Sequence, residues 1–64
     1  MVFKMIEVVE VSEDGYSEAV AKAVKKVTDS GEKVHFFRVL ESRGAVRDGS
    51  IEYQVVLSVA VEAD

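Results

Sequence analysis

Residues 51–62 read IEYQVVLSVAVE, and apolar side chains recur there at every second position. The even-numbered positions carry both polar and apolar side chains, with the polar Gln54 and Ser58 alternating with the apolar Val56 and Ala60. A period of two over a segment of this length predicts a β-strand with one buried face. That face carries the odd-numbered residues, which are Ile51, Tyr53, Val55, Leu57, Val59 and Val61.

The preceding residues predict a second strand joined to the first by a tight turn. Asp48-Gly49 is the dipeptide that favours a two-residue hairpin turn. From Lys33 onward the chain alternates again, and Phe37 and Val39 are expected on the same face as Val55. The other face of this strand is expected to carry Val34, Phe36, Arg38 and Leu40.

A helix and a further strand precede the hairpin. Apolar residues recur at spacings of three and four between Tyr16 and Val27, which predicts an amphipathic helix. Ser12 is expected to cap its start and Gly31 to end it. Phe3–Val11 is short and rich in β-branched residues, so it is expected to be a strand. The order is β-α-β-β, an α+β fold in a single domain over residues 1–64.

Composition excludes several classes of function. The chain has no cysteine and one histidine, so neither a disulfide, a thiolate metal site nor thiol catalysis is expected. The 12 acidic and 8 basic residues give a net charge of −4, without the basic stripe that nucleic-acid binding needs. No apolar run is long enough to span a bilayer and no signal-type segment opens the chain. We expect a cytoplasmic protein with no catalytic and no metal-ligating residues.

The second face of the sheet indicates self-association. One helix covers only one side of a three-stranded sheet, which leaves Phe36, Val56 and Ala60 on the other side. A chain of 64 residues buries only about 60% of the surface of its unfolded form. We therefore expect the uncovered face to form an interface between copies, or a ligand site within one.

Three segments resemble those of dodecins in sequence, order and spacing. They are VFK at residues 2–4 with SE at 12–13, FFRV at 36–39 followed by SRG at 42–44, and EYQVVL at 52–57. The resemblance covers nearly the whole chain. It implies a three-stranded antiparallel sheet wrapped around one helix, and a hollow homododecamer. It also implies a non-enzymatic role, in which flavins bind in pairs between subunits for storage, buffering and protection. FMN is the first expected ligand and riboflavin the second.

The resemblance assigns flavin-binding roles to three residues. A tryptophan that stacks on the flavin in dodecins corresponds to Phe36, and a glutamine that binds the polar edge of the ring corresponds to Gln54. Arg43 matches an Arg-Gly pair of bacterial dodecins and is a candidate for the FMN phosphate. The chain has no tryptophan. The smaller ring is expected to weaken binding about tenfold or less, and to quench flavin fluorescence less than tryptophan does.

Each of these residues also has a structural interpretation. In this interpretation Phe36 fills space in a subunit interface, Gln54 satisfies the backbone of a neighbouring subunit, and Arg43 pairs with Glu41 or Glu52 of another subunit. His35 is expected to be a solvated or interface residue. The corresponding alternative function is a shell of the same fold that has lost flavin binding and holds coenzyme A or ions.

Overall fold

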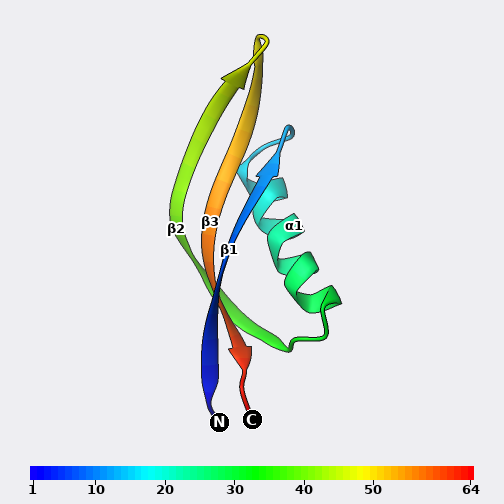
Figure 1. The fold of residues 1–64 in the computed structure, drawn as a ribbon, viewed down its shortest axis with the longest axis vertical. Coiled ribbons are helices and arrows are strands. Elements are labelled where there is room, and N and C mark those ends of the chain that lie inside the picture. The colour runs from blue at the N-terminus through cyan, green and yellow to red at the C-terminus, as the bar shows by residue number, and fades with distance from the viewer.

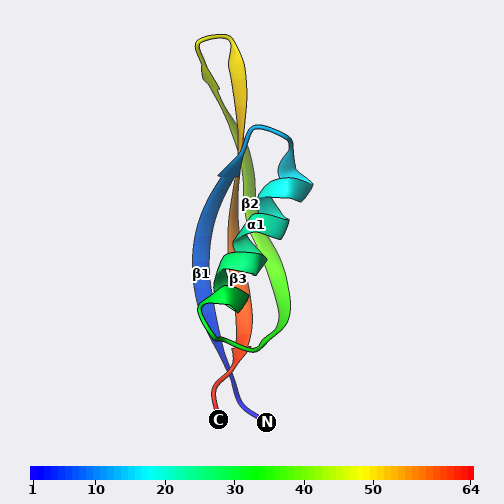
Figure 2. The same cartoon turned by 90° about the vertical axis from the view of Figure 1, so that its right-hand side faces the viewer.

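The computed structural model describes residues 1–64 and has the predicted β-α-β-β order (Figure 1). Strand β1 (Phe3–Ser12) is followed by helix α1 (Tyr16–Asp29), and then by strands β2 (Val34–Arg47) and β3 (Ser50–Glu62). The sheet bows, and α1 lies on its concave side (Figures 1 and 2). The predicted fold class, an antiparallel sheet around one helix, is confirmed.

Strand β3 is the centre of the sheet. The strand order is β1-β3-β2, and both pairs are antiparallel. Asp48 and Gly49 join β2 to β3 with φ angles of 51° and 80°, and two successive positive φ angles are those of a type I′ turn. The predicted hairpin turn is therefore confirmed. The far end of this hairpin extends beyond both β1 and α1 (Figure 1).

The helix ends as predicted but begins differently. Gly31 has a φ of 99° and donates its backbone N–H to the Thr28 carbonyl at 3.0 Å, so it is the left-handed residue that ends α1. Ser12 does not cap the helix, contrary to expectation. Its hydroxyl accepts the backbone N–H of Asp14 at 3.0 Å, and Gly15, with φ of 147°, is the residue that precedes the first turn. α1 does not combine the length and apolarity that crossing a bilayer requires.

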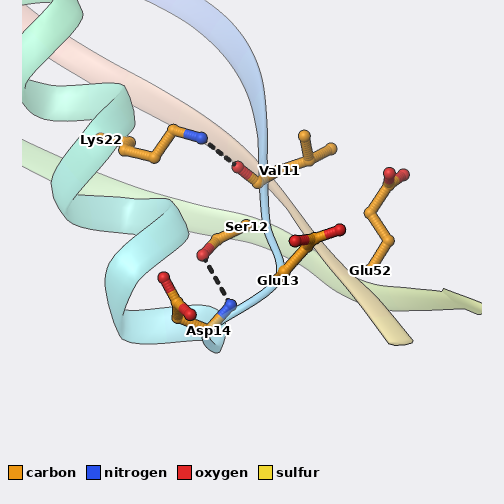
Figure 3. Close-up of a pocket in the computed structure, with 6 residues that line it drawn as sticks. All are labelled: Val11, Ser12, Glu13, Asp14, Lys22 and Glu52. Carbon is orange, nitrogen blue, oxygen red and sulfur yellow. Dashed lines mark hydrogen bonds between the residues drawn. The ribbon is translucent and has the colours of Figure 1, made fainter. Parts of the chain in front are cut away.

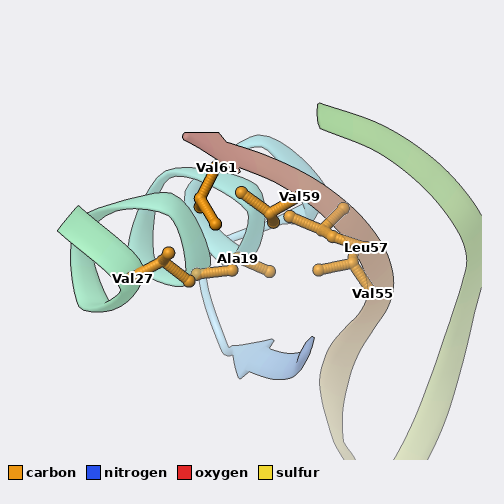
Figure 4. Close-up of a cluster of buried hydrophobic side chains, with 7 residues drawn as sticks. Ala19, Val27, Val55, Leu57, Val59 and Val61 are labelled. Atoms are coloured by element: carbon orange, nitrogen blue, oxygen red, sulfur yellow. The ribbon is translucent and has the colours of Figure 1, made fainter. Parts of the chain in front are cut away.

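The core forms between α1 and the odd-numbered face of β3 over residues 55–61, as the alternation predicts, but Ile51 of the same face is 50% exposed because the hairpin extends beyond the helix. Alanines on the helix let its backbone approach the sheet closely, and larger side chains of β3 fill the space between them (Figure 4). The buried cluster consists of Ala19, Ala23, Val27, Val55, Leu57, Val59 and Val61. Truncation of Leu57, which is fully buried, to alanine is expected to cost about 2–5 kcal/mol of unfolding free energy.

Two β-bulges in β2 change which side chains face the helix. The register shifts between Val34 and Phe36 and again between Val39 and Glu41. Val34 pairs with Val61 and packs against the core, so the expectation that it lies on the uncovered face is wrong. Leu40 is the extra residue of the second bulge and has no partner in the register. The physical reason is that one inserted residue exchanges the two faces of the sheet for all residues of the strand beyond it.

Candidate functional site

All three predicted site residues lie on the face of the sheet that α1 does not cover, which we call the open face. Cross-strand partners share a face, and Phe36 pairs with Ala60 while Arg43 pairs with Gln54. The open face also takes the odd-numbered residues of β1, because Met5 pairs with Ala60. Its large exposed apolar side chains are Phe3, Met5, Val9 and Phe36.

One end of the open face is aromatic. Phe36 is 52% exposed and pairs with Ala60, which has no exposed surface. Phe3, from the opposite edge strand, meets Phe36 edge-on with ring centroids 5.7 Å apart. The two rings meet across β3 on a diagonal, since Phe36 pairs with Ala60 and Phe3 with the adjacent open-face residue Glu62, and the small side chain of Ala60 leaves room for the contact. Phe36 thus remains half exposed to solvent while its ring makes a favourable T-shaped contact with Phe3.

A hydrogen-bonded pair supports the Phe3 ring. His35, the extra residue of the first bulge, lies with its Nε2 2.9 Å from Glu62 Oε1. The imidazole ring is also 4.8 Å from the Phe3 ring, measured between centroids. Lys33 is a weaker second partner of Glu62, at 3.9 Å. The histidine is therefore tied into the aromatic end rather than freely solvated.

The other end of the open face is a polar network around Gln54. Arg43 donates its Nε–H to Gln54 Oε1 at 2.6 Å, and Gln54 donates from Nε2 to Glu52 Oε1 at 2.9 Å. Arg43 Nη1 lies 3.5 Å from Glu41 Oε2, and Arg47 Nη2 lies 4.0 Å from Glu52 Oε1. Within one chain Arg43 therefore lies beside Glu41, and its expected pairing with Glu41 or Glu52 of another subunit stays a prediction.

The two ends are separated within one chain. Phe36 is opposite Ala60, which lies six positions from Gln54 along β3. At about 3.3 Å per residue this separation is about 20 Å, which exceeds the length of a flavin ring system. The structure thus brings Arg43 and Gln54 together and keeps Phe36 apart from them. A single site that uses both Phe36 and Gln54 needs a second copy of the chain.

The hollows of a single chain lie elsewhere. A pocket of about 380 Å³ lies between the end of β1, the following loop and β3 (Figure 3), and a second of about 230 Å³ lies beside it toward the hairpin turn. Both include Glu13 and Glu52, and their lining is mainly polar. Neither includes Phe36, Arg43 or Gln54. No three His, Asp or Glu side chains of the chain lie where they could share a metal ion.

On the opposite face, a buried carboxylate ties the helix to β1. Glu10 Oε2 lies 2.6 Å from Lys26 Nζ, and Glu10 Oε1 accepts the backbone N–H of Val11 at 3.0 Å. These hydrogen bonds, that from Lys26 first, hold the pKa of Glu10 below its ordinary value of 4.5. The pair lies on the side of the sheet that α1 covers and takes no part in the open face.

Two contributors to the open face were not singled out from the sequence. The contact of Phe3 with Phe36 depends on β1 pairing with β3 in one particular register, which no local pattern specifies. Glu52 was considered only as a partner for Arg43. Its position two residues before Gln54 in a period-two segment places both on one face, and this spacing is the signal that would have found it.

The comparisons with known proteins agree with one another. The family model described as Dodecin matches residues 2–64. A dodecin from Thermus thermophilus is 36% identical over 59 residues, which is 91% of this chain and 86% of that protein. A crystal structure of a mutant of T. thermophilus dodecin with phenylalanine in place of a tryptophan matches with a TM-score of 0.89 and 34% identity, over 98% of this chain and 96% of that one.

A second structural relative is described as a calcium-binding protein. The structure of a calcium-chelating antigen of Mycobacterium tuberculosis, called a calcium dodecin with a novel calcium-binding site, has a TM-score of 0.89 and 31% identity. The match covers 100% of this chain and 93% of that one.

Proposed function

The chain belongs to the dodecin family, and from this premise we propose that it is a non-enzymatic flavin-binding protein that acts as a hollow homododecamer. In this proposal the protein stores and buffers flavin, and protects it, in pairs of sites formed between subunits. A cytoplasmic location is part of the same proposal.

The observation that carries the proposal is the presentation of Phe36. A ring that is half exposed, held in a T-shaped contact with Phe3 and paired across the strands with a fully buried alanine, offers an apolar surface to a planar ligand. Gln54 and Arg43, at the polar end of the same face, supply the hydrogen-bonding groups that a flavin ring and a phosphate require. The residues present therefore fit a flavin.

The separation of the two ends supports a paired arrangement. If two copies pack their open faces around a two-fold axis that passes midway between the aromatic and polar ends, Phe36 of each copy lies near Gln54 of the other. Such a contact contains two equivalent sites, one on each side of the axis. Binding in twos then follows from the symmetry of the contact, without a further element.

FMN is the proposed ligand because of Arg43. Its side chain is 48% exposed, and Nε is the atom that binds Gln54. The guanidinium has five N–H donors in a fixed planar array, so it retains donors for a phosphate while it holds the amide. Riboflavin, which lacks the phosphate, is proposed as a weaker ligand of the same site.

Catalysis is not part of the proposal. The chain offers no cysteine, and its single histidine is hydrogen-bonded to Glu62 and placed beside an aromatic ring rather than beside a hydroxyl nucleophile. General acid–base or nucleophilic chemistry needs such a pair within hydrogen-bond reach.

The test compares two neighbouring phenylalanines. FMN is titrated into the wild type, Phe36→Ala and Phe37→Ala, with bound flavin read by absorbance and assembly by native mass spectrometry. Phe37 is 44% exposed but pairs with Val59 on the face that carries the core, so it is a matched control. We expect the wild type to give a twelve-chain mass with flavin added in twos. Phe36→Ala should still assemble into twelve chains but bind no flavin. Phe37→Ala should assemble and bind flavin as the wild type does. Unchanged flavin affinity in Phe36→Ala would overturn the role of Phe36.

The alternative function, a shell that holds another ligand, is supported by one comparison. A relative with the same fold is described as a calcium dodecin, and the two pockets of this chain share the carboxylates Glu13 and Glu52. A wild-type assembly that stays colourless in excess FMN favours this alternative, and calcium titration of the same sample then tests it.

A further inference from the structure

We propose that Glu52 is a positioning residue that fixes the direction of the Gln54 amide, and thereby fixes which way round a flavin ring is bound. This inference rests on the proposed flavin-binding function. It concerns a residue that touches Gln54 and not the ligand, and it follows from the hydrogen bonds on both sides of one side chain.

The Gln54 amide has a single satisfactory orientation. Its oxygen accepts from Arg43 Nε at 2.6 Å, and its NH₂ group donates to Glu52 Oε1 at 2.9 Å. An ionised carboxylate only accepts hydrogen bonds and a guanidinium only donates them. Rotating the amide by half a turn would set oxygen against oxygen and N–H against N–H. Both contacts would then be repulsive, so the two flanking charges select one orientation.

The flanking groups are themselves held in place. Arg43 and Gln54 are direct partners in the antiparallel register. Glu52 stands two residues before Gln54 on the same face of β3, and its carboxylate has Arg47 Nη2 at 4.0 Å. All four residues belong to one hairpin closed by a type I′ turn. The amide is thus oriented before any ligand arrives, which reduces the ordering that binding would otherwise require.

A fixed amide recognises one arrangement of partners. After the bonds to Arg43 and Glu52, the oxygen of Gln54 has a second lone pair and its nitrogen a second hydrogen. These form an acceptor beside a donor in a set order. The polar edge of a flavin carries an imide N–H flanked by two carbonyl groups. The imide N–H can donate to the Gln54 oxygen while one carbonyl accepts from its nitrogen, and the direction of the amide decides which carbonyl that is.

The test separates positioning from simple stability by using two ligands. Riboflavin and 3-methylriboflavin, in which a methyl group replaces the imide hydrogen, are titrated into the wild type and Glu52→Gln. A neutral amide at position 52 can donate or accept, so position 52 no longer selects one orientation of Gln54 and only Arg43 still does. The matched control is Glu41→Gln, which removes another carboxylate of the same network that pairs with Arg43 and not with Gln54.

We expect the wild type to bind riboflavin about tenfold more tightly than the methylated ligand, which corresponds to one hydrogen bond. In Glu52→Gln this ratio should fall to about threefold or less, while Glu41→Gln retains it. A Glu52→Gln protein that keeps the wild-type ratio, whether or not both affinities fall together, would overturn the positioning role. Equal binding of both ligands by the wild type would overturn it while leaving flavin binding intact. A wild type that binds neither ligand would reject the proposed function itself.

A second measurement covers the case in which Glu52→Gln does not assemble. Gln54 is the only side-chain amide in the chain, which has no asparagine. Its NH₂ signals in a nitrogen-edited proton spectrum therefore need no assignment. We expect one of the two protons to exchange slowly with water because it is bonded to Glu52. Fast exchange of both protons in the wild type would overturn the inference.

Discussion

Phe36 and Gln54 face the same side of the sheet, yet lie about 20 Å apart along β3. One chain therefore carries two halves of the proposed flavin site and cannot join them. This relationship makes self-association a requirement of the proposed function rather than an addition to it. It also makes each half separately testable.

Replacing Phe36 by tryptophan should strengthen flavin binding. The indole offers more overlap with the flavin ring, and the expected gain in affinity is about tenfold or less. Tryptophan also donates an electron to an excited flavin more readily than phenylalanine does. The fluorescence of the bound flavin should therefore decrease by a larger factor than the dissociation constant does. Titration and fluorescence lifetimes measure the two effects. An equal lifetime in Phe36→Trp and wild type would mean that this ring does not contact the flavin.

Replacing Ala60 by leucine should disturb the ring of Phe36. Ala60 is fully buried, although it lies on the open face, and Phe36 and Met5 flank it. A larger side chain there is expected to cost about 1–3 kcal/mol of unfolding free energy and to displace the aromatic rings. Flavin affinity should fall with it. Ser58→Leu, one position along the same face, is the control. If flavin affinity survives in Ala60→Leu, the fixed position of Phe36 is not needed for binding.

Replacing Arg43 by alanine should remove the preference for FMN over riboflavin. In the proposed site the guanidinium meets the phosphate, and a charge-assisted hydrogen bond contributes about 1.5–3 kcal/mol. Affinity for FMN should therefore fall about tenfold or more, and affinity for riboflavin less. Calorimetric titration with both ligands measures the ratio. A ratio that stays at the wild-type value would restrict Arg43 to holding Gln54.

Acid should weaken the attachment of α1 through Glu10. The pKa of this carboxyl is lower in the folded chain than its ordinary value of 4.5, because Lys26 and the backbone N–H of Val11 bind the ionised form. Its contribution is therefore fully present above about pH 4.5 and is lost as the pH falls through the folded-state pKa.

The matched variant is Glu10→Gln. It should cost about 1 kcal/mol at neutral pH, because the partner Lys26 is largely exposed and the attraction is screened. Denaturant midpoints of both proteins, measured from pH 7 to pH 3, should converge as the pH falls. Parallel curves over this range would show that the Glu10 pair does not contribute in its ionised form.

The alternation in residues 51–62 was sufficient to predict much of the fold. It identified the face of β3 that packs on α1, and Asp48-Gly49 identified the turn. The predicted face of Val34 is wrong, because the bulge at His35 reverses the parity of β2. Leu40 is itself the extra residue of the second bulge, so it has no cross-strand partner that would assign it to a face. A bulge is decided by the fit of two strands, so an alternating pattern within one strand does not reveal it.

The site was predictable in part for a related reason. Parity placed Phe36 and Gln54 on the uncovered face, because Phe36 lies between the two bulges of β2 and β3, which carries Gln54, has no bulge. The distance between them was not predictable, since it depends on which residues of β2 and β3 are partners. The contact of Phe3 with Phe36 likewise depends on how both edge strands pair with β3, whereas that of Glu52 with Gln54 follows from their spacing within β3.

The central claim, that a flavin site is shared by two chains, is tested most directly by mixing two defective variants. Phe36→Ala and Gln54→Ala are unfolded together in equal amounts, refolded, and titrated with FMN, with each variant treated alone as the control. Half of the two-fold pairs are mixed, and each mixed pair restores one intact site of two. We predict that each variant alone binds little FMN and that the mixture recovers about a quarter of the wild-type capacity. A mixture whose mass spectrum shows mixed assemblies, but which binds no more FMN than the separate variants, would contradict the account.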